Sequence, residues 1–243
     1  GALAVPWLIR AAQQAEKLPL AFSTLGCPRW DWRTILDRAM EWGYAAIELR
    51  GIQDDLDLTK RSEFKGARLA GTRQDLRAVG LRVCCLGAST QLHEADPAKR
   101  AAHLDEGKRY IDLAQQLEAP YVRVFGDRLP PAQPQQAVLD RVAAGLRELG
   151  QYAQGSQVSV LIESHGDFCR SPLLRSAIED TGVANVALLW DVHHTVVSGN
   201  EEPGETLQHL QRHVRHTHLK DSIRVGSGVR YVLTGAGRIP LGD

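Results

Sequence analysis

The sequence lacks three features that would place it in other classes of protein. No apolar run among its 243 residues approaches the roughly 20 residues that span a bilayer, so we expect no membrane association. No long apolar stretch follows a basic start, which argues against a secretory signal. Charge is also balanced, with 29 Lys and Arg against 29 Asp and Glu. A nucleic-acid partner is therefore not expected, although a local basic groove stays open.

Cysteine is scarce, and its spacing excludes the common metal and redox motifs. The four cysteines, Cys27, Cys84, Cys85 and Cys169, form no CxxC pair. We interpret them as reduced packing residues of a cytoplasmic protein, rather than as catalytic thiols.

Apolar periodicity alternates regularly between strand and helix along the chain. Strands are predicted at residues 20–24, 46–49, 81–86, 121–125, 158–162, 186–190 and 215–219. Helices are predicted at residues 31–43, 62–79, 97–117, 134–153, 171–179 and 205–213. Such alternation is typical of a parallel sheet with helices outside it.

Seven strands in about 220 residues suit an α/β protein of the (β/α)8 TIM-barrel class. The sequence accounts for all but the last βα units, so we expect the barrel to be C-terminally incomplete in this chain. We divide it into an N-terminal extension, residues 1–19, and a barrel domain, residues 20–243.

Metal-ligand side chains follow three consecutive predicted strands. Glu163 ends one strand, Asp191 and His194 form an Asp-x-x-His after the next, and His218 lies in a His-x-His on the third. Because the C-terminal ends of barrel strands converge on one face, these segments can share one ion. His193 is an alternative to His194 as the histidine that reaches the ion.

Other polar residues also lie near the ends of the predicted strands. His165 follows Glu163 on the same side of an extended chain, and Lys220 continues the side of His218. Glu48 and Arg123 either face the pocket or form an ion pair inside the barrel. Trp30 and Trp32, after the first strand, either cap the pocket or pack.

Imidazole combined with carboxylate indicates which divalent ion to expect. Mn²⁺, Zn²⁺, Co²⁺ and Fe²⁺ accept such ligands, whereas Mg²⁺ and Ca²⁺ prefer shells of oxygen. We therefore predict a divalent metal cofactor from the first group in preference to Mg²⁺.

At these residues the chain resembles the xylose isomerase-like TIM-barrel superfamily, and within it the sugar phosphate isomerase and epimerase group. The motifs that carry the resemblance are residues 23–28, 41–51, 124–126, 162–165, 190–194 and 216–221. The resemblance implies that Glu163, Asp191 and His218 hold the metal. A fourth ligand, a Glu after strand eight, has no match and is expected beyond residue 243.

The resemblance also implies substrate-binding and catalytic roles. His194 and Arg224 would contact substrate, and Glu163 would transfer the proton. The positions of His165, Glu48 and Lys220 near strand ends make them further substrate-binding candidates. The loop after strand seven commonly reads Gly-Glu-Gly in such proteins, whereas this chain has Gly235-Ala236-Gly237.

The expected function is a metal-dependent isomerase or epimerase of a carbohydrate, phosphorylated or not, acting by proton abstraction beside a carbonyl through an enediolate. A lyase like the inosose or dehydroshikimate dehydratases is the alternative within enzymes. A non-catalytic sugar-binding barrel and a phosphodiesterase like the apurinic-site endonucleases are further alternatives. Many relatives assemble as homo-oligomers, which makes a homo-oligomer the expectation here by analogy.

Overall fold

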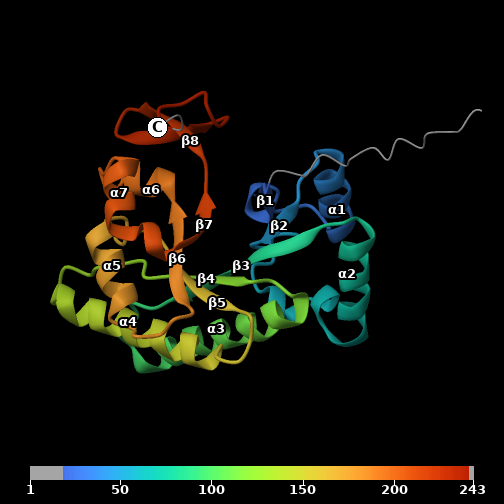
Figure 1. Cartoon of the computed structure of the whole chain (residues 1–243), viewed down its shortest axis with the longest axis horizontal. Coiled ribbons are helices and arrows are strands. Elements are labelled where there is room, and N and C mark those ends of the chain that lie inside the picture. The colour runs from blue at the N-terminus through green and yellow to red at the C-terminus, as the bar shows by residue number, and fades with distance from the viewer. Residues whose placement is uncertain (1–18, 241–243) are drawn as a thin grey trace, which may run out of the picture.

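The computed structural model describes residues 19–240, so nearly all of the expected N-terminal extension lies outside the described residues. Seven strands alternate with helices along the chain (Figure 1). The strands are β1 (Ala21–Ser23), β2 (Ala46–Leu49), β3 (Arg82–Gln91), β4 (Tyr121–Phe125), β5 (Ser159–Glu163), β6 (Val186–Asp191) and β7 (Val214–His218). The helices are α1 (Trp32–Glu41), α2 (Gly66–Ala78), α3 (Pro97–Leu117), α4 (Gln135–Tyr152), α5 (Ser171–Glu179), α6 (Val192–Val197) and α7 (Pro203–Leu210).

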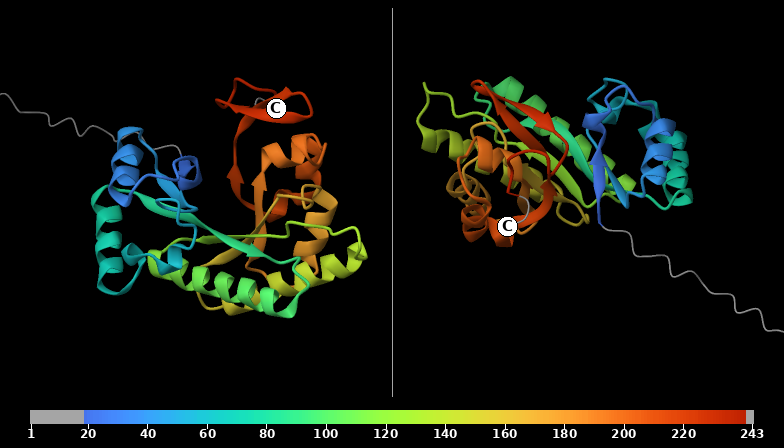
Figure 2. Two further views of the ribbon diagram at one scale, coloured as in Figure 1. Left: turned by 180° about the vertical axis from the view of Figure 1, so that it is seen from behind. Right: turned by 90° about the horizontal axis from the view of Figure 1, so that it is seen from above.

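All seven strands pair in parallel in the order in which they occur in the chain, β1 to β7. The sheet curls into a half-barrel with the helices along its outer side, and Figure 2 shows the same arrangement from behind and from above. Within residues 19–240, β1 pairs only with β2 and β7 only with β6. The predicted TIM-barrel class is confirmed.

The chain after β7 adds an element that periodicity does not indicate. β8 (Asp221–Val225) and β9 (Gly228–Val232) form an antiparallel hairpin outside the main sheet. The hairpin lies beyond the C-terminal ends of β6 and β7, beside α6 and α7 (Figures 1 and 2). It therefore stands at the end of the sheet where barrel enzymes carry their active sites.

The two faces of the sheet carry different side chains because successive residues of a strand point to opposite sides. Outward residues such as Val160, Ile162 and Leu188 join the large core beneath the helices. A second, small apolar cluster of Cys85, Leu161, Ala187 and Leu189 fills the concave side. Polar residues at the next positions along the same strands lie above this cluster.

Local sequence signals explain where helices begin. The side chain of Asp31 accepts a hydrogen bond from Thr34 N at 2.8 Å, and that of Asp96 accepts one from Lys99 N at 2.9 Å. Each caps amide groups that have no partner inside the helix. Pro97 at the first position of α3 loses no helical hydrogen bond there.

The structure places the cysteines and the two tryptophans, Trp30 and Trp32, in packing positions or as free thiols. All four cysteines are free, and Cys85 and Cys169 are buried. Trp30 packs against Phe22 with ring centroids 6.3 Å apart, and Trp32 packs against Phe64 at 5.8 Å. Both tryptophans thus take the packing alternative. Between residues 19 and 240, no helix combines the length and apolar character needed to cross a bilayer.

Candidate metal centre

Three of the predicted ligands meet on the concave face of the sheet. Asp191 ends β6 directly opposite His218 of β7 in the strand register, and Glu163 ends the neighbouring β5. His218 Nδ1 lies 3.4 Å from Glu163 Oε1 and 3.8 Å from Asp191 Oδ2. Ser164 fixes the two strand ends, since its hydroxyl accepts from Asp191 N at 2.8 Å.

These separations are close to those around one divalent ion, and Glu163, Asp191 and His194 likewise offer ligand atoms that all lie within 4.8 Å of one another. Metal–nitrogen and metal–oxygen bonds of roughly 2.0–2.2 Å place the ligand atoms about 3–3.5 Å apart. Small side-chain movements would bring Glu163, Asp191 and His218 to that spacing. Two carboxylates and an imidazole form a donor set typical of first-row transition ions, so the residues present fit the predicted metal.

A buried arginine, Arg123, forms an ion pair with Glu163. Arg123 Nε lies 2.9 Å from Glu163 Oε2, and Arg123 Nη1 donates to Ala88 O at 2.7 Å. Burial opposes ionisation of Glu163, but Arg123 and the His218 imidazole outweigh it and lower the pKa of Glu163 to about 2. Glu163 is therefore a permanently ionised carboxylate at neutral pH, ready to bind a cation.

His218 contacts a further carboxylate across the concave face, that of Glu48 on β2. Its Nε2 atom lies 2.7 Å from Glu48 Oε2, and His216 Nε2 lies 3.4 Å from the same oxygen. Burial disfavours a charged imidazole, yet Glu163 and Glu48 raise the pKa of His218 to about 10. Burial likewise opposes ionisation of Glu48, and the two histidines hold the pKa of that carboxyl well below its usual range.

Helix α6 resolves the competition between His193 and His194. Asp191 caps α6 and accepts from His194 N at 3.2 Å, which brings His194 Nε2 to 3.6 Å from Asp191 Oδ2. His193 points elsewhere, with its Nε2 atom 2.8 Å from Ser222 Oγ of the hairpin. His194 is thus the member of the pair that faces the carboxylates.

Lys220 lies between Asp191 and His194. Its Nζ atom is 2.7 Å from Asp191 Oδ2 and 2.8 Å from His194 Nε2. Because an ammonium group only donates, His194 accepts this hydrogen bond as a neutral imidazole. Consistently, burial, with a further contribution from Lys220, lowers the pKa of His194 to about 4.

The remaining predicted residues lie at different distances from the centre. The His165 ring lies 4.9 Å from that of His194 and lines a cavity of about 630 Å³ with Asp127 and Asp167. Arg224 lies on the exposed part of the hairpin, where its Nε atom approaches Gly226 O at 3.5 Å. Its predicted role in substrate binding stays a prediction.

Some neighbours of the centre could not be anticipated from strand ends. The Tyr231 ring lies 5.3 Å from that of His193 and 5.8 Å from Lys220 Nζ. It arrives on β9, where the sequence shows no barrel periodicity. Arg123 forms an ion pair inside the barrel with Glu163, and Glu48 pairs there with His218.

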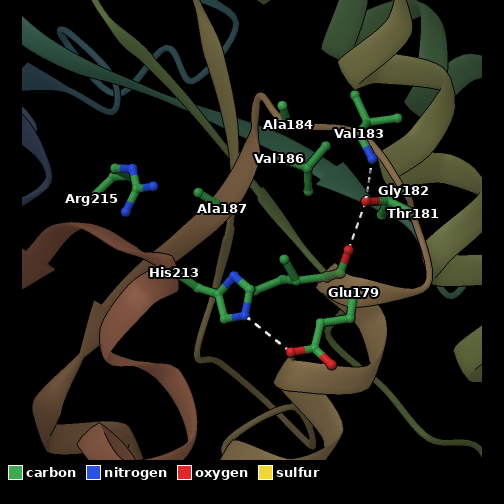
Figure 3. Close-up of a pocket in the computed structure, with 10 residues that line it drawn as sticks. Glu179, Thr181, Gly182, Val183, Ala184, Val186, Ala187, His213 and Arg215 are labelled. Atoms are coloured by element: carbon green, nitrogen blue, oxygen red, sulfur yellow. Dashed lines mark hydrogen bonds and ion pairs between the residues drawn. The ribbon is translucent and has the colours of Figure 1, made fainter.

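A second cavity of about 370 Å³ lies at the opposite ends of β6 and β7. Figure 3 shows Glu179 and His213 facing each other across it, with Glu179 Oε1 3.3 Å from His213 Nε2. Arg175 and Arg212 pair with the same carboxylate. In barrels this end of the strands carries stability rather than catalysis, so we place no active site here.

Solved structures share the fold at low sequence identity. The IolI protein with a bound zinc atom superposes with a TM-score of 0.79 and 18% identity, covering 93% of this chain and 82% of that one. The probable 3-DHS dehydratase AsbF of Bacillus anthracis gives 0.72 and 16%, covering 91% and 85%. D-psicose 3-epimerase of Clostridium cellulolyticum H10 with D-tagatose gives 0.70 and 13%, covering 92% and 78%.

Comparison of sequences gives the family. No curated protein matches the chain. The sequence profile described as Xylose isomerase-like TIM barrel, however, matches residues 36–243. This range holds strands β2 to β9, including Glu48, Glu163, Asp191 and His218. The chain therefore belongs to the xylose isomerase-like TIM barrel family.

Proposed function

We propose that this chain is a divalent-metal-dependent sugar isomerase or epimerase that moves a proton on the carbon beside a carbonyl. The observation that carries the proposal is the meeting of Glu163, Asp191 and His218 on adjoining strand ends, with His218 Nδ1 within 3.4 and 3.8 Å of the two carboxylates. The bound zinc of the IolI structure and the sugar in the D-psicose 3-epimerase structure, both of the same fold, support it.

Each residue has a role that follows from its charge and position. When bound, the ion would draw electron density from a sugar carbonyl and a neighbouring hydroxyl, which acidifies the C–H bond of the carbon that carries that hydroxyl. Glu163, Asp191 and His218 would hold that ion. Glu163 would also accept the proton, although its pairing with Arg123 makes it a weak base.

The second group of residues would bind the substrate. Neutral His194 and cationic Lys220 touch each other beside Asp191, where Lys220 can donate to a sugar hydroxyl and His194 can donate through its other ring nitrogen. His165 extends this polar surface toward the 630 Å³ cavity.

A dehydratase is the second candidate, and Lys220 is the observation that favours it. Loss of water after the same proton abstraction needs an acid to protonate the departing hydroxyl. The Lys220 ammonium, 2.7 Å from Asp191 Oδ2, is an acid placed at the candidate centre. The likeness of fold to the AsbF dehydratase supports this alternative.

The test is an incubation of the purified protein with a panel of ketoses and cyclic keto-polyols in D₂O, with Mn²⁺, Zn²⁺ or Co²⁺ added. Deuterium entering the recovered sugar, or its isomer, supports the isomerase or epimerase. Loss of water from the substrate supports the dehydratase. Binding of a metal and a sugar with neither reaction would instead indicate a non-catalytic sugar-binding barrel.

A further inference from the structure

The imidazole of His218 lies between two sets of carboxylates and turns a different nitrogen to each. Nδ1 faces Glu163 Oε1 and Asp191 Oδ2, at 3.4 and 3.8 Å. Nε2 faces Glu48 Oε2 at 2.7 Å, across 170 residues of sequence. The ring therefore joins the candidate metal ligands on β5 and β6 to a residue of β2.

Glu48 is held firmly where it meets this ring. Only 3% of the residue is exposed, and β2 is bonded on both sides, to β1 and to β3. Among residues 19–240, the hydrogen-bond and ion-pair partners of its carboxylate are the imidazoles of His216 and His218. Because a buried charge without a partner is costly, the Glu48 carboxylate is held beside these two imidazoles.

We propose that Glu48 is a positioning residue that selects the tautomer of His218, an inference that rests on the proposed metal-dependent function. A histidine that binds a metal is neutral and keeps one N–H. An ionised carboxylate can only accept, so Glu48 holds that hydrogen on Nε2. The lone pair is left on Nδ1, the nitrogen that faces Glu163 and Asp191.

The competing assignment makes Glu48, His216 and His218 the ligands of a separate ion. The geometry favours the hydrogen bond. Two ligand atoms of a tetrahedral zinc ion are about 3.3 Å apart. The 2.7 Å between Glu48 Oε2 and His218 Nε2 is shorter than that, and is a normal length for a hydrogen bond between a charged and a polar group.

The experiment compares ion binding by the wild-type protein with that of Glu48→Gln, Glu48→Ala and His216→Gln, the last of which removes a ligand of the competing ion but keeps a donor to Glu48. Zn²⁺ or Co²⁺ is titrated against a competing chelator at fixed pH, and circular dichroism checks that each variant folds. Removing an outer carboxylate of this kind lowers metal affinity about 10- to 100-fold, and we expect that loss in Glu48→Ala. Glu48→Gln keeps an acceptor oxygen, so its loss is smaller.

A spectroscopic readout separates positioning from a merely structural role. Long-range ¹H–¹⁵N spectra of the zinc-loaded wild type should show hydrogen on Nε2 and metal on Nδ1 of His218, with one ion bound per chain and near-normal affinity in His216→Gln. Wild-type affinity in Glu48→Ala would overturn the assignment. So would metal on Nε2, or a second ion that is lost in His216→Gln.

These readouts do not depend on turnover. A protein that binds one ion in the expected tautomer but exchanges no deuterium with any sugar defeats the proposed activity and leaves the role of Glu48 supported. A wild-type protein that binds no ion overturns both. The two failures are therefore distinguishable in one set of measurements.

Discussion

Arg123 Nε lies 2.9 Å from Glu163 Oε2, and both side chains are almost completely buried, with 3% and 6% of their surfaces exposed. The pair joins β4 to the end of β5 on the concave face. A carboxylate kept ionised in an enclosed site needs such a cation nearby. Arg123 thus stabilises the ionised form of Glu163, which is the form that a metal ion would bind.

Removing Arg123 should destabilise the metal-free protein strongly. Arg123→Leu leaves Glu163 buried without its main cation, and breaking a buried pair in this way costs about 3–5 kcal/mol of unfolding free energy. Urea denaturation measures it. Arg33→Ala is the control, because Arg33 pairs with Asp37 on the surface with 80% of its side chain exposed, and we expect a change below about 1 kcal/mol. Equal losses in the two variants would contradict this.

The sequence predicts the barrel well because the strands from β2 to β6 contain strong apolar runs. The bounds of β2, α3, β4 and α5 agree with the structure to the residue. β3 runs on to Gln91, further than the apolar run at 81–86 indicates, because its polar end pairs with β4. Periodicity does not indicate the hairpin, since the buried residues of β8, Asp221 and Ser222, are polar and β9 is mostly exposed, so neither strand shows an apolar face.

The candidate site was predictable in its ligands but not in its supporting contacts. Glu163, Asp191 and His218 end successive parallel strands, and parallel register alone brings them together. Glu48 is five strands away from His218 in the sheet order, so only the curl of the sheet brings the two into contact. Local pattern carries no information about such a contact.

Three histidine variants should separate metal ligands from their neighbours. His218→Ala removes an imidazole that faces both carboxylates, so we expect a large loss of bound metal in elemental analysis. His194→Ala should retain more metal, because His194 is engaged by Lys220. His193→Ala is the control, since its ring bonds to Ser222. Unchanged metal content in His218→Ala would count against the site.

Metal binding should release a proton and strengthen as pH rises. The pKa of His218 is about 10 without metal, so its imidazolium must lose a proton before it binds an ion. Glu163, with a pKa of about 2, exchanges none in the neutral range. Calorimetric titration in buffers of different ionisation enthalpy should find about one proton released per ion. Equal affinities at about pH 6 and pH 8 would be incompatible with this linkage.

In the absence of metal, the same histidine should make stability depend on pH at the alkaline end. The raised folded-state pKa of His218 means that its contribution is fully present below the unfolded value of 6.5 and is lost as pH rises through about 10. Urea midpoints of the wild type should therefore fall over that range. His218→Gln should show a flatter profile, and parallel profiles would refute the assignment.

Glu163→Gln should keep the fold, because glutamine retains an acceptor oxygen beside Arg123, and should abolish proton exchange with the substrate. Glutamine has nearly the same shape but neither the charge to bind the ion nor the basicity to take a proton. The measurement is deuterium incorporation from D₂O into whichever sugar the wild type accepts. Glu179→Gln, at the opposite end of the barrel, is the matched control and should exchange normally. Normal exchange in Glu163→Gln would remove its catalytic role.

Gly237→Ala should loosen the segment that follows the hairpin. Asp221 Oδ2 accepts from Gly235 N at 3.0 Å and from Gly237 N at 2.7 Å, while Oδ1 accepts from Ile239 N at 3.1 Å. A Cβ atom on Gly237 would lie 2.1 Å from Asp221 Oδ1, so the carboxylate must leave these amides. Faster amide hydrogen exchange at residues 235–239 is the expected result.

Gly71→Ala is the control for Gly237→Ala, because the added methyl group has room there. Gly71 lies inside α2, and an added Cβ would meet no atom within 4 Å. Alanine there should raise the unfolding free energy by roughly 0.5–1 kcal/mol, because it restricts the unfolded chain without strain in the helix. Exchange at residues 235–239 should stay unchanged in Gly71→Ala. If it also stayed unchanged in Gly237→Ala, the carboxylate of Asp221 could not be what holds that segment against the hairpin.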